Sequence, residues 1–187
     1  MPRYILLDRD GVINRRVVDG YVTSWSQFEF LPGALEALRL LAENDYSAIV
    51  ISNQACVGKG LLTLEGLNEI TDHFVAEVEK HGGRIERMYY CPHRTEDRCY
   101  CRKPLPGLLI RAQRDYGFSF SATFLVGDCA NDAVAAHRVG CPFILISPAW
   151  NINGQGASLA QAVGRDLYWA VLFVLDHAKG QPAPTEG

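Results

Sequence analysis

Residues 4–14 read YILLDRDGVIN, an apolar run that ends in Asp8 and Asp10 and is followed at once by Gly11. The apolar run at 4–7 has the composition of a buried strand in a parallel sheet. Two carboxylates separated by one residue repel each other and are costly to remove from water, so folding alone does not require them. A bound cation would offset this cost, and the motif therefore suggests a metal site at the end of the first strand.

Four further apolar runs, mostly β-branched or aromatic, predict strands, and helical patterns separate them. The strands are expected at residues 48–52, 85–91, 123–127 and 143–146. The helices are expected at 34–43, from an N-cap at Thr63 to about residue 81, and at 106–116, 132–139 and 165–178. This alternation predicts an α/β fold of Rossmann type, with a single doubly wound and mostly parallel sheet.

The chain has 187 residues, of which 48% are hydrophobic and 21% charged, with a formal net charge of -3. This length suits one domain with a substantial core, expected over 1–179, followed by a disordered tail at 180–187. The charge balance argues against binding nucleic acid through bulk positive charge, and the longest apolar run, 167–175, is too short to cross a bilayer. Because the N-terminus lacks a signal pattern, we expect a cytoplasmic protein. We also expect a monomer without nucleic-acid or membrane partners.

Polar residues stand at the carboxyl ends of three predicted strands. Asp8 and Asp10 follow the first strand, residues 52–54 follow the second, and Asp128 follows the fourth. Ligands of parallel sheets bind at the carboxyl ends of the strands, so we expect these residues to converge. A carboxylate from the first strand together with Asp128 could hold Mg²⁺, which prefers hard oxygen ligands and commonly accompanies substrate phosphates.

Phosphoryl transfer is the chemistry that this set of residues favours. Asp8 could attack phosphorus as a nucleophile, and Asp10 could give and take the proton. Two like charges about 4 Å apart repel by roughly 4 kcal/mol at an effective dielectric constant near 20, so the attack needs cations nearby. Mg²⁺ and Lys103 would supply them, while Ser52 and Asn53 could bind the remaining phosphate oxygens.

Each of these motifs also has a plainer interpretation. Asp8-x-Asp10 can be a solvated turn, the segment at 52–54 can be an ordinary loop, and Gly127-Asp128 can begin a helix whose first turn contains Asn131 and Asp132. Their joint occurrence, each at the end of a predicted strand, favours the functional interpretation.

Three cysteines and one histidine lie close together between residues 91 and 101, which we call the cysteine–histidine loop. Three thiolates and one imidazole suit a closed, tetrahedral and therefore structural Zn²⁺ site, and free thiols are the alternative. Zinc would fix a loop that leads directly into Lys103, so we expect it to position this lysine. The predicted zinc ligands are Cys91, His93, Cys99 and Cys101.

The segments DRDGVIN, ISNQ, RKP and GDCAND resemble the four motifs of the haloacid dehalogenase superfamily of phosphatases. The resemblance implies that Asp8 forms an aspartyl-phosphate and that Asp10 is the acid and base. Mg²⁺ would be held by Asp8, Asp10 and Asp128. The other implied residues are Ser52 and Lys103 as phosphate ligands, with Asn131 and Asp132 in support.

Within this superfamily, the cysteine–histidine loop resembles that of a small branch whose members have no cap domain. Members of this branch hydrolyse either the 7-phosphate of a heptose 1,7-bisphosphate, for nucleotide-heptose and lipopolysaccharide synthesis, or histidinol phosphate. The segments DGYVTSWSQFEFLPGA, SNQACVGKGLLT and CRKPLPG favour the sugar bisphosphate. A zinc-loop interaction module without catalysis is a third possibility.

The resemblance also implies a set of contacts to the phosphorylated sugar. Cys129 departs from the branch pattern where a lysine can assist binding, and Cys56 departs where a small residue is usual. For Tyr21, packing within its loop is an equal alternative. The implied substrate contacts are Arg9, Asn14, Asp19, Gly20, Tyr21, Ser52, Asn53, Gln54, Arg102 and Lys103.

Overall fold

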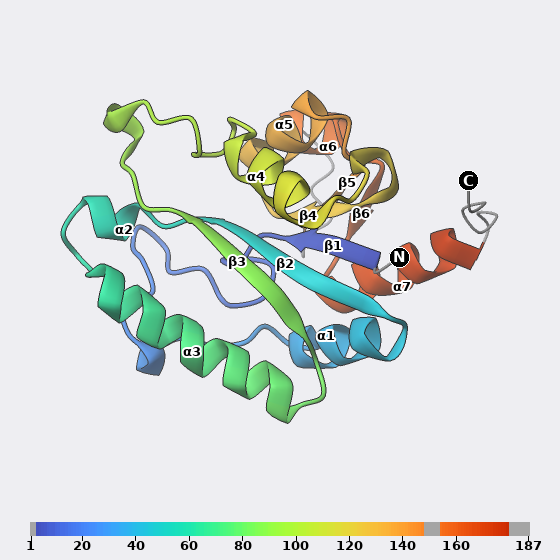
Figure 1. Cartoon of the computed structure of the whole chain (residues 1–187), viewed down its shortest axis with the longest axis horizontal. Helices are drawn as coiled ribbons and strands as arrows, with labels where there is room; N and C mark the ends of the chain where they lie inside the picture. The colour runs from blue at the N-terminus through green and yellow to red at the C-terminus, as the bar shows by residue number, and fades with distance from the viewer. Residues whose placement is uncertain (1–2, 148–153, 180–187) are drawn as a thin grey trace.

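A parallel sheet of six strands in the order β3-β2-β1-β4-β5-β6 forms the centre of the described structure (Figure 1). The computed structural model describes residues 3–147 and 154–179. All neighbouring strands run parallel. The strands are β1 (Arg3–Leu7), β2 (Tyr46–Asn53), β3 (Ile85–Cys91), β4 (Leu125–Gly127), β5 (Phe143–Ile146) and β6 (Ala162–Gly164).

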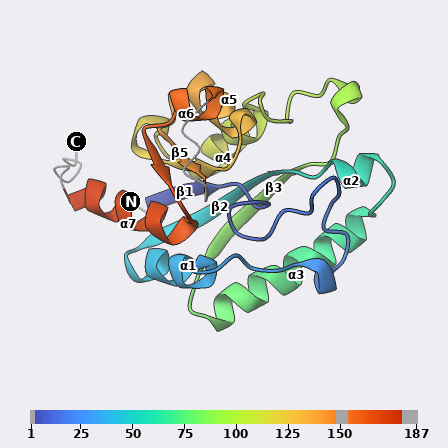
Figure 2. The ribbon, with the colours of Figure 1, turned by 180° about the vertical axis from the view of Figure 1, so that it is seen from behind.

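Helices cover both faces of this sheet, which confirms the doubly wound α/β fold (Figures 1 and 2). Side chains alternate along a strand, so Ile5 and Leu7 of β1 join one core and Leu6 joins the other. The first core is completed by α1 (Ala34–Glu43), α3 (Leu64–Lys80) and α7 (Leu167–Lys179). The second core is completed by α4 (Gly107–Tyr116) and α5 (Ala130–Arg138).

The longer helices and strands lie close to the residues at which the sequence patterns predicted them. Local hydrogen bonds determine where two of the helices begin. The helix α3 begins after Thr63, whose hydroxyl accepts a hydrogen bond from the Gly66 N–H at 3.0 Å. The helix α5 begins at Ala130 rather than Asp132, because the Asp132 side chain caps the helix by accepting from the Cys129 N–H at 3.3 Å. The short elements that the patterns did not predict are β6, α2 (Ala55–Gly58), α6 (Gln155–Ser158), η1 (Trp25–Gln27), η2 (Thr95–Asp97) and η3 (Phe120–Ala122).

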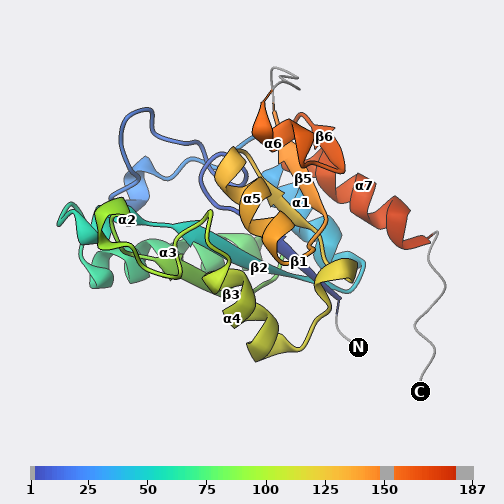
Figure 3. The same ribbon diagram turned by 90° about the horizontal axis from the view of Figure 1, so that it is seen from above.

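Two long connections lie at the end of the sheet that carries α2 (Figure 3). One follows β1 and includes η1, and the other is the cysteine–histidine loop after β3. The connection after β1 leads to α1 on one face of the sheet, whereas α5, which follows β4, lies on the other face. The topology of the sheet therefore switches between the neighbouring strands β1 and β4. None of the helices in the described part of the chain has the length and apolar character that crossing a membrane requires. The predicted tail at 180–187 lies outside the described residues.

Candidate active site

A cavity of about 720 Å³ opens at the carboxyl edge of the sheet, beside the switch point between β1 and β4. Its buried or largely buried part, the cavity floor, consists of Asp8, Asp10, Ser52, Lys103 and Asp132. Its more exposed cations, the cavity rim, are Arg16, Lys59 and Arg102. The other predicted site residues that line the cavity are Asp19, Gly20, Tyr21, Asn53 and Asn131.

Lys103 lies in the cavity floor between two aspartates. Its ammonium nitrogen is 2.9 Å from Asp8 Oδ1 and 2.6 Å from Asp132 Oδ1, and it donates to the Ile51 carbonyl oxygen at 2.7 Å. Burial opposes the charged form, but the carboxylates of Asp132 and Asp8 raise the pKa of Lys103 above its usual value. Lys103 therefore remains a cation, next to the carboxylate that is expected to meet phosphorus.

The backbone of Lys103 is fixed by Asn53, at the end of β2. The Asn53 side chain donates to the Lys103 carbonyl oxygen at 3.0 Å and accepts from the Lys103 N–H at 3.1 Å. The strand β2 continues through Asn53 because this residue pairs with Cys91 of β3. Asn53 thus joins the sheet to the residue that follows the cysteine–histidine loop.

The carboxyl groups of Asp8 and Asp128 both have raised pKa values, although cations lie nearby. Burial is the main reason that the pKa of Asp8 rises to about 6, with Asp132 and Asp10 adding to the rise and Lys103 opposing it. Burial and the charge of Asp8 raise the pKa of Asp128 to about 7. Buried carboxylate oxygens that repel one another in this way fit a hard divalent cation such as Mg²⁺.

Two glycines allow the aspartates to approach so closely. Gly11 has a φ of +93°, and a Cβ atom there would collide with the Asp128 carboxylate. A Cβ atom at Gly127 would collide with the Asp132 side chain. The close packing of the aspartates therefore requires the glycine that stands next to an aspartate in DRDG and in GDCAND.

Asp132 is one of three residues, with Asp128 and Cys129, whose potential ligand atoms lie within 4.8 Å of one another. One of its oxygens faces Lys103, however, and the other accepts from the Cys129 thiol at 3.0 Å. We therefore assign Asp132 to holding Lys103 rather than to a metal ion. The resemblance implied only a supporting role for Asp132, without naming the group that it supports.

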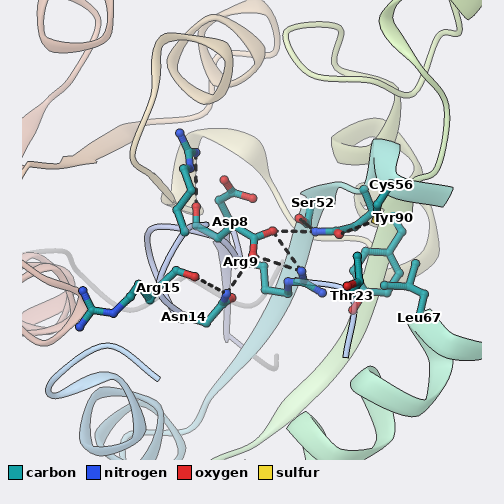
Figure 4. A network of polar contacts seen from close by, with 12 residues as sticks. Asp8, Arg9, Asn14, Arg15, Thr23, Ser52, Cys56, Leu67 and Tyr90 are labelled. Carbon is teal, nitrogen blue, oxygen red and sulfur yellow. Dashed lines mark hydrogen bonds and ion pairs between the residues drawn. The ribbon is translucent and has the colours of Figure 1, made fainter. Parts of the chain in front are cut away.

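Asp10 is surrounded by hydrogen-bond donors, of which Arg9 and Asn14 are labelled in Figure 4. Both carboxylate oxygens lie 3.1 Å from an Arg9 nitrogen, while Asn14 donates to Oδ1 at 2.8 Å and Gln54 donates to Oδ2 at 2.7 Å. Burial on its own would raise the pKa of Asp10, but the Arg9 charge and these hydrogen bonds lower it below the usual value. Asp10 is therefore a carboxylate whose orientation is fixed by these hydrogen bonds.

The side chains of Arg9, Asn14 and Gln54 do not lie where the resemblance implied. It assigned them to substrate contacts, but they are exposed by only 1%, 0% and 1%, and in the described structure the cavity lining does not include them. The Arg9 guanidinium lies over the rings of Phe28 and Tyr90, at 5.8 and 6.0 Å from their centroids. We assign all three side chains to holding Asp10, a role for which the sequence carries no periodic or local signal.

The cysteine–histidine loop brings its four predicted ligands together. The three sulfur atoms are 3.3 to 3.5 Å apart, and His93 Nδ1 lies 3.2 Å from Cys101 Sγ and 3.7 Å from Cys91 Sγ. Tetrahedral zinc with Zn–S bonds of about 2.3 Å places sulfur atoms about 3.8 Å apart. The cluster therefore could hold a metal ion, directly before the rim residue Arg102.

Two rim residues were not predicted from the sequence. Arg16 Nη2 lies 2.7 Å from Asp128 Oδ1, and Lys59 Nζ lies 5.1 Å from the centroid of the Tyr21 ring. Together with Arg102 they place positive charge around the mouth of the cavity. Their only sequence signal is that each is a basic residue a few positions after a motif.

The chain resembles enzymes of known name over most of its length. A family model described as HAD-hydrolase-like matches residues 100–148. The D-glycero-alpha-D-manno-heptose-1,7-bisphosphate 7-phosphatase of Mycobacterium bovis is 35% identical over 178 residues, which cover 95% of this chain and 93% of the relative. The D-glycero-beta-D-manno-heptose-1,7-bisphosphate 7-phosphatase of Bordetella bronchiseptica is 36% identical over 139 residues, covering 74% and 77%.

Solved structures show the same likeness. The crystal structure of D,D-heptose 1,7-bisphosphate phosphatase from B. bronchiseptica, complexed with magnesium and phosphate, has a TM-score of 0.84 and 31% identity. The alignment covers 94% of this chain and 99% of that one. The corresponding enzyme from Burkholderia thailandensis has a TM-score of 0.65 and 25% identity, with coverages of 94% and 98%.

Proposed function

The chain belongs to the haloacid dehalogenase superfamily of phosphatases, and from this premise we propose that it hydrolyses the 7-phosphate of a D-glycero-D-manno-heptose 1,7-bisphosphate. It would be a Mg²⁺-dependent phosphoric monoester hydrolase. Relatives named for this reaction support the substrate, and the magnesium and phosphate in a similar crystal structure support the cation.

The observation that carries the proposal is the pairing of an acidic floor with a basic rim in one cavity. The floor offers Asp8 and Lys103 to the phosphate that is cleaved. The rim also offers Lys59 and Arg102, so a second phosphate at the other end of the substrate would meet positive charge. Histidinol phosphate would bring an amine and an imidazole to the same cations. The rim therefore favours a bisphosphate over histidinol phosphate.

In the first step an Asp8 oxygen attacks phosphorus, and the bond between phosphorus and the sugar oxygen breaks. Asp10 gives a proton to that oxygen, so that heptose 1-phosphate leaves as an alcohol. Asp10 holds the proton that it took from water in the preceding turnover, or from solvent in the first one, and the negative charge of the bound phosphate raises its pKa and favours this protonated form. Asp8 now carries the phosphoryl group as an aspartyl-phosphate.

In the second step a water molecule attacks the phosphorus atom, and Asp10 takes a proton from it. The bond from phosphorus to Asp8 breaks, which releases inorganic phosphate and restores the free carboxylate. Arg9, Asn14 and Gln54 hold Asp10 in position for this transfer, and because they favour its ionised form they assist the proton release of the first step. Throughout, Lys103 holds the phosphoryl oxygens.

The metal assignments follow from the chemistry of the ligands. Asp8, Asp10 and Asp128 would hold Mg²⁺, which neutralises charge on the phosphoryl group when bound. The raised pKa values of Asp8 and Asp128, which result from burial and from neighbouring carboxylates, support this assignment. We assign Zn²⁺ to the four residues of the cysteine–histidine loop, where it would hold Arg102 and Lys103 in place without taking part in the reaction.

Phosphate release from a panel of substrates tests the proposal. The panel contains both anomers of heptose 1,7-bisphosphate, histidinol phosphate and fructose 1,6-bisphosphate, each with Mg²⁺ and with a chelator. We expect the highest kcat/KM for a heptose bisphosphate and no turnover with the chelator. A preference for histidinol phosphate would overturn the substrate, and turnover of none of the four would favour an interaction module.

We also propose that the enzyme is a cytoplasmic monomer that supplies heptose 1-phosphate to nucleotide-heptose synthesis. The phosphorylated sugar is a metabolic intermediate, which supports this location. Light scattering on the purified protein measures its mass directly, and a mass of two chains would contradict the monomer.

A further inference from the structure

The carboxylates of the cavity floor are paired with buried cations. Lys103, 2% exposed, lies 2.9 Å from Asp8 and 2.6 Å from Asp132. Arg9, 1% exposed, lies 3.1 Å from Asp10. A cation buried to this degree cannot leave without stranding an uncompensated charge in the protein interior. These counterions are therefore fixed parts of the site.

Asp128 has a different kind of partner. Arg16 Nη2 lies 2.7 Å from Asp128 Oδ1, yet the Arg16 side chain is 50% exposed. Arg16 belongs to the long connection after β1, where its guanidinium also donates to the Asp10 carbonyl oxygen at 3.4 Å. An ion pair with one half-exposed partner is held less firmly than a buried pair, because water can solvate the guanidinium once it leaves. Arg16 is thus a counterion that can exchange.

Arg16 also stands between Asp128 and the cavity. Within the described residues the cavity is lined by Arg16 and not by Asp128. The Asp128 carboxylate is itself only 15% exposed and faces the charge of Asp8, which Arg16 partly offsets. An ion that binds Asp128 from the cavity must therefore take the place of the guanidinium.

We propose that Arg16 is an exchangeable counterion of the metal site, which holds Asp128 while the site is empty and transfers to the phosphate when a divalent cation binds. Two cations on one carboxylate repel each other, so binding of the ion releases the guanidinium. The released group already lines the cavity, and a guanidinium binds phosphate oxygens in a bidentate manner. The second half of this proposal rests on the proposed phosphatase function.

Calorimetric titration with Mg²⁺ alone tests the first half. The variants are Arg16→Gln and, as a matched control, Arg15→Gln. Arg15 is the neighbouring arginine and pairs with Glu29 at 2.8 Å on the surface. Arg16→Gln removes the guanidinium that competes with Mg²⁺ for Asp128. Mg²⁺ should therefore bind this variant about two- to fivefold more tightly than the wild type. Arg15→Gln should bind Mg²⁺ as the wild type does. Equal or weaker binding by Arg16→Gln would overturn the exchange.

Inorganic phosphate tests the second half, with Mg²⁺ at saturation. Arg16→Gln should bind phosphate about 10- to 100-fold more weakly than the wild type, as expected for a lost charged hydrogen bond, while Arg15→Gln should be unchanged. Unchanged phosphate affinity in Arg16→Gln would overturn the transfer. Neither titration involves the sugar, so a wrong assignment of the heptose substrate would leave both results interpretable. Unfolding curves of both variants in chelator would establish that they are folded.

Discussion

The ammonium nitrogen of Lys103 lies 2.6 Å from a carboxylate oxygen of Asp132, and both side chains are almost completely buried. Asp132 stands in the first turn of α5, after β4, whereas Lys103 follows the cysteine–histidine loop after β3. This ion pair joins the two segments across the cavity floor. It leaves the lysine within reach of Asp8, at 2.9 Å.

Replacing Asp132 should therefore damage both stability and catalysis. In Asp132→Asn we expect the free energy of unfolding to fall by about 3 to 5 kcal/mol, because Lys103 loses a buried partner. We expect kcat to fall at least about tenfold, since the lysine is held less firmly beside Asp8. Urea unfolding and phosphate release measure the two effects. The control is Asp72→Asn, on the exposed face of α3, and equal behaviour of both variants would contradict the role of Asp132.

Replacing either aspartate of the first motif should abolish turnover without unfolding the protein. An amide at position 8 cannot form the phosphoenzyme, and an amide at position 10 cannot transfer the proton. We expect Asp8→Asn and Asp10→Asn each to lose at least about 10³-fold in kcat. Phosphate release measures the loss, and circular dichroism establishes that each variant is folded. Activity retained by a folded Asp8→Asn would disprove its assignment as nucleophile.

Arg9 should act through Asp10 and not through the substrate. In Arg9→Gln we expect kcat to fall about 10- to 100-fold with KM nearly unchanged, because Asp10 loses the cation that holds it. Stability should fall by about 3 to 5 kcal/mol, since a buried carboxylate is left without its charged partner. Steady-state kinetics and urea unfolding test this.

The matched control for Arg9 is Arg39→Gln. Arg39 forms an exposed pair with Glu43 at 3.0 Å, so its loss should cost no more than about 0.5 kcal/mol. A large rise in KM in Arg9→Gln, with stability unchanged, would instead favour the substrate contact that the resemblance implied.

The cysteine–histidine loop should require its metal ion for activity. We expect metal analysis to find zinc in the wild type and little in Cys99→Ser, because three ligands hold the ion less tightly than four. The variant should unfold at a lower temperature and lose activity, since Arg102 and Lys103 follow the loop directly. Cys141→Ser, which changes a buried thiol outside the cluster, should retain its zinc. Absence of zinc from the wild type would disprove the assignment.

Several elements of the fold were predictable because they are long enough to show a pattern. Helix α1 has the predicted bounds, and α3 begins after the predicted cap at Thr63. By contrast, β6 has three residues and α2 has four, too few for a period of 2 or 3.6 residues to appear. Their formation depends on neighbours already in place.

The sequence was sufficient to show which chemical groups stand at the strand ends, because apolar strands, caps and closely spaced ligands are local patterns. Packing alone settled which groups face the cavity. Arg9 and Asp10 are adjacent, yet one is buried against aromatic rings and the other reaches the floor. Arg16 and Asp128 are 112 positions apart, and their ion pair forms only because the connection after β1 lies over the end of β4. Contacts between distant segments leave no periodic trace along a chain, so they became visible only once the sheet had brought those segments together.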